Sequence, residues 1–328
     1  MQQEENSAFV DESPAAQVQQ CAARVQEAIQ KVIVGQHESV EMLLAALFTG
    51  GHLLLEGVPG IAKTLLARLL ARTVSAGFSR IQFTPDLMPA DILGTMVFNP
   101  KTADFSFRPG PIFSNIILVD EINRAPAKTQ AALFEVMEER QVTVDGQTHA
   151  MAVPFMVIAT QNPIEQEGTY RLPEAQLDRF LFRILMDYPS LEEEKHILQR
   201  FHGDFEGKAG QDLQPIISPQ EIADCRRRIE QVVVSDELLN YIATLVHQTR
   251  HHPDLFLGAS PRASLAIARS AKALAAMAGR NFITPDDVQR VAVPVLNHRL
   301  LLTPEREMEG YRVQQVIEDI VRSIPVPR

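Results

Sequence analysis

The sequence has no tryptophan, and aromatic residues make up only 6% of its 328 residues. This scarcity argues against a protein that binds single-stranded nucleic acid by stacking bases on aromatic side chains. The two cysteines, Cys21 and Cys225, are too few for a disulfide framework and lack the spaced partners of a zinc site. We therefore expect two reduced thiols in a cytoplasmic protein.

Long apolar runs and excess positive charge are also missing. No apolar stretch approaches the roughly 20 residues that cross a bilayer, and no signal peptide is recognisable at the N-terminus. The formal net charge of −10 disfavours general binding to phosphate backbones. Hydrophobic residues at 45% and charged residues at 22% are typical of a folded globular protein, and the length favours about two domains.

Three regions follow one another along the chain. Residues 1–14 are polar and acidic, which predicts a flexible tail. Residues 15–188 alternate apolar strand-like runs with helical patterns, as in an α/β domain whose parallel sheet is covered on both faces. Residues 189–328 carry repeated helix-start signals and no strand pattern, which predicts an all-helical second domain. The strands are expected at 52–56, 81–83, 115–120, 153–159 and 179–184.

Two predicted β-hairpins interrupt this alternation, at residues 94–112 and 141–152. Excursions of this kind from an α/β unit often carry function. The second hairpin contains no Lys or Arg, and the first has only Lys101 and Arg108. We therefore expect neither to grip nucleic acid. The run Arg226–Arg228 is interpreted as a solvated helix face rather than a nucleic-acid patch.

Residues 57–64 fit the template of a phosphate-binding loop between a strand and a helix. They read Gly-Val-Pro-Gly-Ile-Ala-Lys-Thr, with Ala62 at the second fixed glycine. Backbone N–H groups and a helix N-terminus would cradle phosphate, Lys63 would reach the outer phosphates, and the Thr64 hydroxyl would bind Mg²⁺. The alternative is an ordinary tight turn before a helix.

Asp120 and Glu121 directly follow a predicted buried strand. They would therefore lie at the carboxyl edge of the sheet, where α/β proteins bind ligands. Asp120 suits the Mg²⁺ shell, and Glu121 suits activation of an attacking water. The alternative, a solvated strand end, loses weight because a phosphate loop lies on the same sheet.

In these segments and others, the chain resembles the AAA+ ATPases and, within them, the MoxR family. Residues 34–36 resemble the adenine-side motif, 57–64 the MoxR phosphate loop with its alanine, and 117–125 the Walker B segment. Residues 159–163 are similar to the sensor 1 strand end, 172–180 to the arginine-finger segment, and 258–262 to the sensor 2 helix start. The likeness spans roughly residues 20–325, and the two hairpins match the family's insertions.

The resemblance implies site residues and their roles. Asn162 would orient the lytic water, Arg179 would reach the γ-phosphate of the next subunit, and Arg262 would fold back on the γ-phosphate. Their alternatives are a turn-capping Asn, a local pair with Asp178, and a surface Arg. Arg124 and Arg171 are second-rank candidates. The implied nucleotide-binding residues are Val34, Gly35, Gln36, Gly57, Val58, Pro59, Gly60, Ile61, Ala62, Lys63, Thr64, Leu65 and Asp120.

The resemblance also implies a function. We expect Mg²⁺-dependent ATP hydrolysis in a homo-oligomeric ring, with a hexamer as the expected size, that remodels or matures a protein client. The family implies a partner with a von Willebrand factor A domain. The alternatives are a DNA-translocating motor and a nucleotide-gated scaffold that does not hydrolyse ATP. The few cations of the hairpins disfavour the first, and the complete set of catalytic residues disfavours the second.

Overall fold

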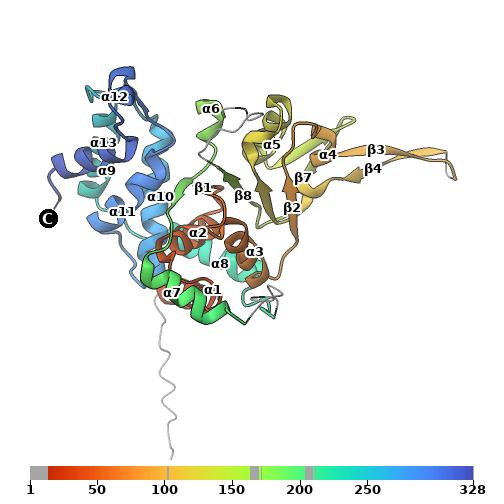
Figure 1. Cartoon of the computed structure of the whole chain (residues 1–328), viewed down its shortest axis with the longest axis horizontal. Coiled ribbons are helices and arrows are strands. Elements are labelled where there is room, and N and C mark those ends of the chain that lie inside the picture. The colour runs from red at the N-terminus through yellow and green to blue at the C-terminus, as the bar shows by residue number, and fades with distance from the viewer. Residues whose placement is uncertain are drawn as a thin grey trace, which may run out of the picture.

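The computed structural model describes residues 14–101, 103–162, 170, 172–203, 210 and 212–327. The tail is predicted at residues 1–14, of which 1–13 lie outside this part, as do Pro163 and the candidate Arg171, whereas Pro14 already belongs to the first helix. A parallel sheet occupies one half of the molecule and a group of helices the other (Figure 1). The two β-hairpins extend from the sheet on the side away from these helices.

The predicted parallel sheet is confirmed. Its five strands lie in the order β2-β5-β8-β1-β9, and all neighbours are parallel. β1 and β5 are buried at every position, as their unbroken apolar runs predict. The strands are β1 (Leu53–Gly57), β2 (Phe78–Gln82), β5 (Ile116–Asp120), β8 (Met156–Gln161) and β9 (Phe182–Met186).

Each face of the sheet packs on its own hydrophobic core. Leu53 and Leu55 of β1 point to one core, and Leu54 between them points to the other. The first core is covered by α1 (Pro14–Gln30), α2 (His37–Thr49) and α3 (Lys63–Thr73), and the second by α4 (Pro89–Leu93) and α5 (Ala127–Glu139). The alternation of side chains along the strands therefore produces a three-layered unit.

The C-terminal half is helical, as the helix-start signals predict. Ser190 and Ser218 form capping boxes with Glu193 and Glu221. The helices are α7 (Leu191–Phe201), α8 (Pro219–Glu230), α9 (Asp236–Thr249), α10 (Pro261–Met277), α11 (Pro285–Leu296), α12 (Pro304–Met308) and α13 (Val313–Ser323). A short antiparallel pair, β10 (Leu255–Leu257) with β11 (Leu301–Leu302), is an addition to the expected all-helical pattern. Its strands are too short to show a periodic pattern in the sequence.

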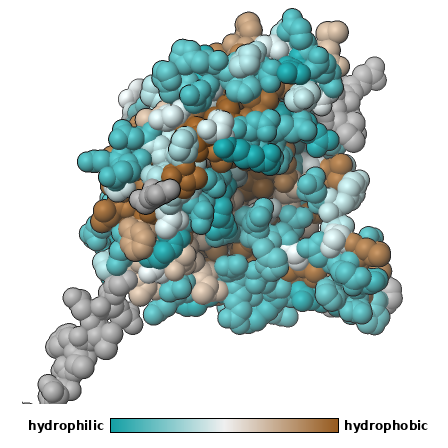
Figure 2. Space-filling view, turned by 90° about the vertical axis from the view of Figure 1, so that its left-hand side faces the viewer, coloured by the Kyte–Doolittle hydropathy of each residue, from teal (hydrophilic) through white to brown (hydrophobic). Residues whose placement is uncertain are grey.

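The first core continues from the sheet into the helical half. Residues of α1 and α2 pack in the same cluster as residues of α8, α10 and α11. A cavity of about 490 Å³ also lies where the two halves meet, lined by Leu54 and Arg183 from the sheet and by Phe256 and Leu301 from the helical half. The outer face of the helical half is mostly hydrophilic, with hydrophobic residues near a central hollow (Figure 2).

Both predicted hairpins are present and contact each other. β3 (Gly94–Asn99) pairs with β4 (Asp104–Pro109), and β6 (Gln141–Val144) with β7 (Gln147–Ala150). The rings of Phe107 and His149 stack with centroids 4.6 Å apart. The first hairpin projects far from the sheet (Figure 1) and exposes Phe98 and Phe105 near its end. Among the described residues, no helix combines the length and apolar character of a membrane span.

Candidate active site

The loop after β1 forms a turn of backbone at the carboxyl edge of the sheet. β1 ends at Gly57 and α3 begins at Lys63. Gly60 and Ala62 both have left-handed torsions, with φ of 89° and 67°. A side chain at residue 60 would meet nothing within 4 Å, so this part of the loop is open to a ligand. Ala62 adopts the glycine-like conformation at a cost of roughly 1 kcal/mol.

Lys63 ties the loop to a neighbouring strand. Its ammonium group donates to the carbonyl oxygen of Gly57 and to that of Gln161, the second at 3.1 Å. Burial lowers the pKa of Lys63, and the nearby carboxylates of Glu56, Glu121 and Asp120 act in the opposite direction. The cation is therefore held at the N-terminus of α3, among acids and beside the loop.

Asp120 is the centre of a buried polar cluster at the same edge. Its Oδ1 accepts hydrogen bonds from the hydroxyls of Thr64 at 3.1 Å and Thr160 at 3.2 Å. Its Oδ2 forms an ion pair with Nε of Arg80 at 2.6 Å. Since Asp120 is only 4% exposed, these contacts fix the carboxylate next to the helix that begins at Lys63.

Glu121 has a separate set of partners. Its backbone is left-handed, with φ of 56°, and its N–H donates to the Thr160 hydroxyl at 3.1 Å. Its carboxylate accepts from the Gln82 amide at 3.2 Å and forms an ion pair with Arg124 at 3.0 Å. The turn thus directs the two consecutive acids to different neighbours. Arg124, a second-rank candidate from the sequence, lies in direct contact with Glu121.

The remaining sequence-predicted residues of this edge lie close by. Asn162 directly follows β8, whose last residue Gln161 bonds to Lys63. Gln36 donates from its amide to the Asp187 carbonyl just after β9, at 3.4 Å. Gly35 has φ of 69° and packs so closely on Glu193 that a side chain there would collide with it. Residues 34–36 therefore lie near the carboxyl end of β9, the strand next to β1.

This edge fits a nucleotide with Mg²⁺. The phosphate loop offers an open turn at Gly60 and the N-terminus of α3, both suited to phosphate oxygens. The hydroxyl of Thr64 and the carboxylate of Asp120 are hard oxygen ligands 3.1 Å apart, which is the chemistry that Mg²⁺ prefers. Glu121 stands next to them as a candidate base.

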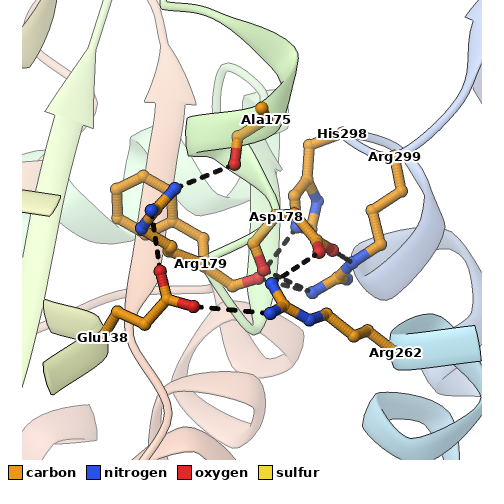
Figure 3. A network of polar contacts seen from close by, with 8 residues as sticks. Glu138, Ala175, Asp178, Arg179, Arg262, His298 and Arg299 are labelled. Atoms are coloured by element: carbon orange, nitrogen blue, oxygen red, sulfur yellow. Dashed lines mark hydrogen bonds and ion pairs between the residues drawn. The ribbon is translucent and has the colours of Figure 1, made fainter. Parts of the chain in front are cut away.

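Arg179 and Arg262 form a second group, at the opposite edge of the sheet (Figure 3). Arg179 follows the short helix α6 (Glu174–Leu177), and its Nη2 lies 2.7 Å from Glu138 Oε2. Arg262, in the first turn of α10, contacts the other oxygen of Glu138 at 3.4 Å and Asp178 at 3.6 Å. Glu138 therefore bridges the two arginines, and the local Arg179–Asp178 pair, the alternative considered from the sequence, is not the pairing found.

Asp178 is held by Arg299 from the helical half. Arg299 Nε lies 2.7 Å from Asp178 Oδ1, and its Nη2 donates to the Phe180 carbonyl at 2.7 Å. Burial lowers the pKa of Arg299, whereas Asp178 raises it. His298 donates from its Nε2 to the same carbonyl, at 2.9 Å, and burial together with the Arg299 charge holds its pKa well below the ordinary value. These contacts anchor the segment that carries Arg179.

The two groups are separated by the length of β1. Glu138 follows Met137, whose carbonyl contacts His52 at the amino end of β1, whereas the phosphate loop begins at its carboxyl end. Four steps along a strand span about 13 Å. Arg262 thus lies beside Arg179 and does not reach the phosphate loop of its own chain. This corrects the expectation that it folds back there, because the start of α10 packs at the other end of the sheet.

Sequence reasoning missed several partners of these residues. Arg80 and Gln82 contact Asp120 and Glu121 from β2, and Glu138 joins the two arginines. Alternation along β2 is the available signal, since Phe78, Arg80 and Gln82 share the face that carries Asp120 on β5. The Glu138 contact depends on tertiary packing and leaves no local pattern.

Comparisons with known proteins agree with this geometry. Residues 52–182 match the model of the ATPase family associated with various cellular activities (AAA), and residues 247–320 match the AAA lid domain. The fold and the phosphate-loop site therefore define an AAA+ ATPase.

Relatives that match over most of their length identify the family within the AAA+ ATPases. The chain is 44% identical to Chaperone MoxR1 of Mycobacterium tuberculosis over 92% of this chain and 81% of the relative. It is 46% identical to the uncharacterized protein YeaC of Bacillus subtilis over 92% of this chain and 93% of the relative. The crystal structure of a candidate ATPase from Cytophaga hutchinsonii superposes with a TM-score of 0.88 at 42% identity, covering 96% of this chain and 97% of that one. The chain belongs to the MoxR family of AAA+ ATPases.

Proposed function

We propose that this protein hydrolyses ATP to ADP and phosphate in a Mg²⁺-dependent reaction at the carboxyl edge of the sheet. The observation that carries this proposal is the convergence of Lys63 and Thr64, which follow β1, with Asp120 and Glu121 at the end of β5, the strand on the other side of β8. Bound Mg²⁺, held through Thr64 and Asp120, would supply charge neutralisation for the phosphates. Residues 34–36 are proposed to border the adenine.

The residues of the chain divide the chemistry among them. Lys63 binds the outer phosphates, and the backbone N–H groups of residues 60–65 position them. Glu121 takes a proton from the attacking water, and Asn162 orients that water from the end of β8. Gln82 and Arg124 both contact Oε2 of Glu121. If this oxygen accepts the proton, these contacts have to break first or be shared with the attacking water.

We further propose that the active unit is a ring of identical subunits. Arg179 and Arg262 lie at the edge of the sheet opposite to the phosphate loop, so one subunit can present both to the nucleotide of the next. Head-to-tail contacts of this kind close into rings. Two guanidinium groups at the neighbouring γ-phosphate would stabilise the charge that develops in the transition state. The ring size expected from the resemblance is six.

Mixing of inactive variants tests the shared site. Lys63→Ala subunits lack phosphate binding but retain Arg179, and Arg179→Ala subunits retain the phosphate loop. We expect each variant alone to be inactive and their mixture to regain ATP turnover at interfaces that combine an intact loop with an intact Arg179. Two preparations of the same variant, mixed at equal total concentration, are the matched control. A mixture that stays inactive although it assembles, as seen by sedimentation, contradicts the shared site.

A protein client is proposed rather than nucleic acid. The projecting hairpin exposes Val97, Phe98 and Phe105, and residues 141–150 of the other hairpin contain no Lys or Arg. Apolar tips suit contacts with protein, whereas phosphate backbones require cations. Family membership supports a partner with a von Willebrand factor A domain, and the free thiols of Cys21 and Cys225 support action in the cytoplasm. ATP turnover that rises strongly with DNA at low salt would contradict the protein client.

A further inference from the structure

A second cluster of arginines lies next to Arg179 and Arg262, where α2 ends. A hollow of about 320 Å³ opens there, at the lower end of the range for ligand pockets. Its floor includes Gly50 and Gly51, and its walls include Arg140 and Arg269. Arg179, Arg262 and Arg299 line the same hollow, and its acidic residues are Glu138 and Asp178.

Arg140 and Arg226 converge on the C-terminus of α2. Arg140 Nη2 donates to the Gly50 carbonyl at 2.7 Å, and Arg226 Nε donates to the Phe48 carbonyl at 3.3 Å. The Arg226 guanidinium packs so closely on Gly50 that a side chain at residue 50 would collide with it. The sequence predicts a solvated face for residues 226–228. Arg227 is exposed as expected, but Arg226 turns inward, and its Nη2 is buried without an acceptor.

Arg269 is the third member of the cluster and has no partner of its own. It stands two turns after Arg262 on α10 and makes no hydrogen bond or ion pair with any residue that the structure describes. Its pKa is lowered, first by desolvation of the guanidinium and then by repulsion from Arg140. The pKa of Arg226 is also lowered, first by burial and then by repulsion from Arg140 and Arg269. The nearby acid Glu230 opposes this shift.

The local charge balance is strongly positive in a chain whose net charge is −10. Arg179, Arg262 and Arg299 share Glu138 and Asp178, so these acids do not compensate the cluster. The partial negative charge at the C-terminus of α2 offsets only about half a unit. The cluster has three guanidinium groups, but Glu230 is the one acid near them, and the buried Nη2 of Arg226 has no acceptor. This excess of donors and positive charge favours the binding of an external anion.

We propose that Arg140 and Arg269, with the Arg226 guanidinium packed behind Gly50, form a second anion site, which binds a phosphate group in the hollow beside Arg179 and Arg262. Guanidinium groups match phosphate oxygens in geometry as well as in charge. The phosphate group has two sources, a free anion such as pyrophosphate or the nucleotide of a neighbouring subunit. The first source is independent of the proposed ring, and the second depends on it.

Calorimetric titration with pyrophosphate tests the site without ATP turnover. The Lys63→Ala background removes phosphate binding at the phosphate loop, so the titration reports on the remaining anion sites. In that background we expect Arg269→Gln to weaken pyrophosphate binding at least tenfold. Arg269→Lys, which keeps the charge but loses the planar donor pair, should recover only part of the loss. Circular dichroism spectra and melting curves check that the variants fold.

Arg227→Gln is the matched control, because it lies next to Arg226 on α8 but pairs at the surface with Asp224. It should leave pyrophosphate binding within twofold. The proposal is overturned if Arg269→Gln binds pyrophosphate as tightly as its background, or if Arg227→Gln loses as much affinity. Such a result would leave ATP hydrolysis at the phosphate loop untouched, so the two proposals fail separately.

ATP turnover of Arg269→Gln, with Lys63 intact, distinguishes the two sources once the site is established. If the neighbouring nucleotide supplies the phosphate group, turnover falls at least fivefold in the assembled protein. If a free anion supplies it, turnover in phosphate-free buffer stays within twofold of the unmodified protein. Both results support the site and assign its ligand.

Discussion

The two edges of the parallel sheet differ in the charges that they gather. The carboxyl edge brings Asp120 and Glu121 around a single lysine of the phosphate loop, whereas the amino edge gathers Arg179, Arg262 and Arg299 around Glu138 and Asp178, with three further arginines beside them. The acids at the first edge hold cations in place, and the arginines at the second exceed the local acids. One strand length therefore separates the phosphate loop from the arginine group, and the proposed ring would bring the two together between neighbouring subunits.

The largest expected effect comes from the candidate base at the carboxyl edge. Glu121→Gln keeps the size and hydrogen-bonding capacity of the side chain but removes its basicity. We expect ATP turnover to fall at least 100-fold, the usual contribution of a general base, with ATP affinity within threefold. Steady-state turnover and equilibrium binding of ATP measure the two quantities. Glu139→Gln, at the exposed end of α5, is the control, and unchanged turnover of Glu121→Gln would remove Glu121 from this role.

The amino edge predicts a dependence of stability on pH. Burial lowers the pKa of His52 from 6.5 to about 4, helped by repulsion from Arg140 and Arg269. Between pH 6.5 and pH 4, His52 is therefore protonated in the unfolded chain but neutral in the folded chain. The contribution of His52 to stability is fully present above pH 6.5 and falls as the pH drops toward 4, with a loss of roughly 2 to 3 kcal/mol at pH 4.5.

Urea unfolding at pH 7 and pH 4.5 measures this loss. His52→Gln removes the titrating group, so its free energy of unfolding should fall less than that of the unmodified protein over the same interval. The difference between the two changes isolates His52 from the carboxylates, which titrate in both proteins. Equal losses in both would show that His52 does not carry the effect.

Substitution of Arg262 tests whether this residue acts on the nucleotide of its own subunit or on that of a neighbouring one. The expected effect is smaller than that at Glu121. Arg262→Ala should lower turnover of the assembled protein about tenfold, less than the roughly 10³–10⁵-fold contribution of an arginine finger, because Arg179 would still reach the same γ-phosphate. ATP binding by subunits kept dilute enough to remain separate should not change, because Arg262 lies away from its own phosphate loop. The exposed Arg322 on α13 offers a control substitution. Weaker ATP binding by separate Arg262→Ala subunits would place Arg262 in its own site.

The smallest effect is expected from a substitution of Arg80. Its guanidinium pairs with Asp120 and so competes with Mg²⁺ for the carboxylate. The Arg80 side chain is 48% exposed, so water weakens its pair with the buried Asp120, and Arg80→Gln should lower the Mg²⁺ concentration for half-maximal turnover about threefold, equivalent to about 0.7 kcal/mol. Magnesium titrations of ATP turnover measure it, with Arg68→Gln on the exposed side of α3 as control. A higher Mg²⁺ requirement would mean that Arg80 helps to hold the site.

Much of the fold and one edge of the site could be predicted from the sequence. The apolar runs at β1 and β5 leave no alternative to buried strands, and the phosphate loop and Asp120 follow them directly. Local patterns could not reveal the contacts of Arg262 or Arg226. Each depends on which helix packs at the amino edge, a property of tertiary structure. Likewise β10 and β11 pair across more than 40 residues and are too short to show a period.

The shared core of α1, α2 and the C-terminal helices has a consequence for motion. A separate body would need its own core and a thin connection, but here buried residues run without interruption from β1 into α10 and α11. Arg299 also fastens the C-terminal half to the segment before β9. We therefore expect a force on Arg262 to move the sheet and the C-terminal helices as one rigid body. Because the β3–β4 hairpin projects far from the sheet (Figure 1), a rotation of this body would displace the end of the hairpin most.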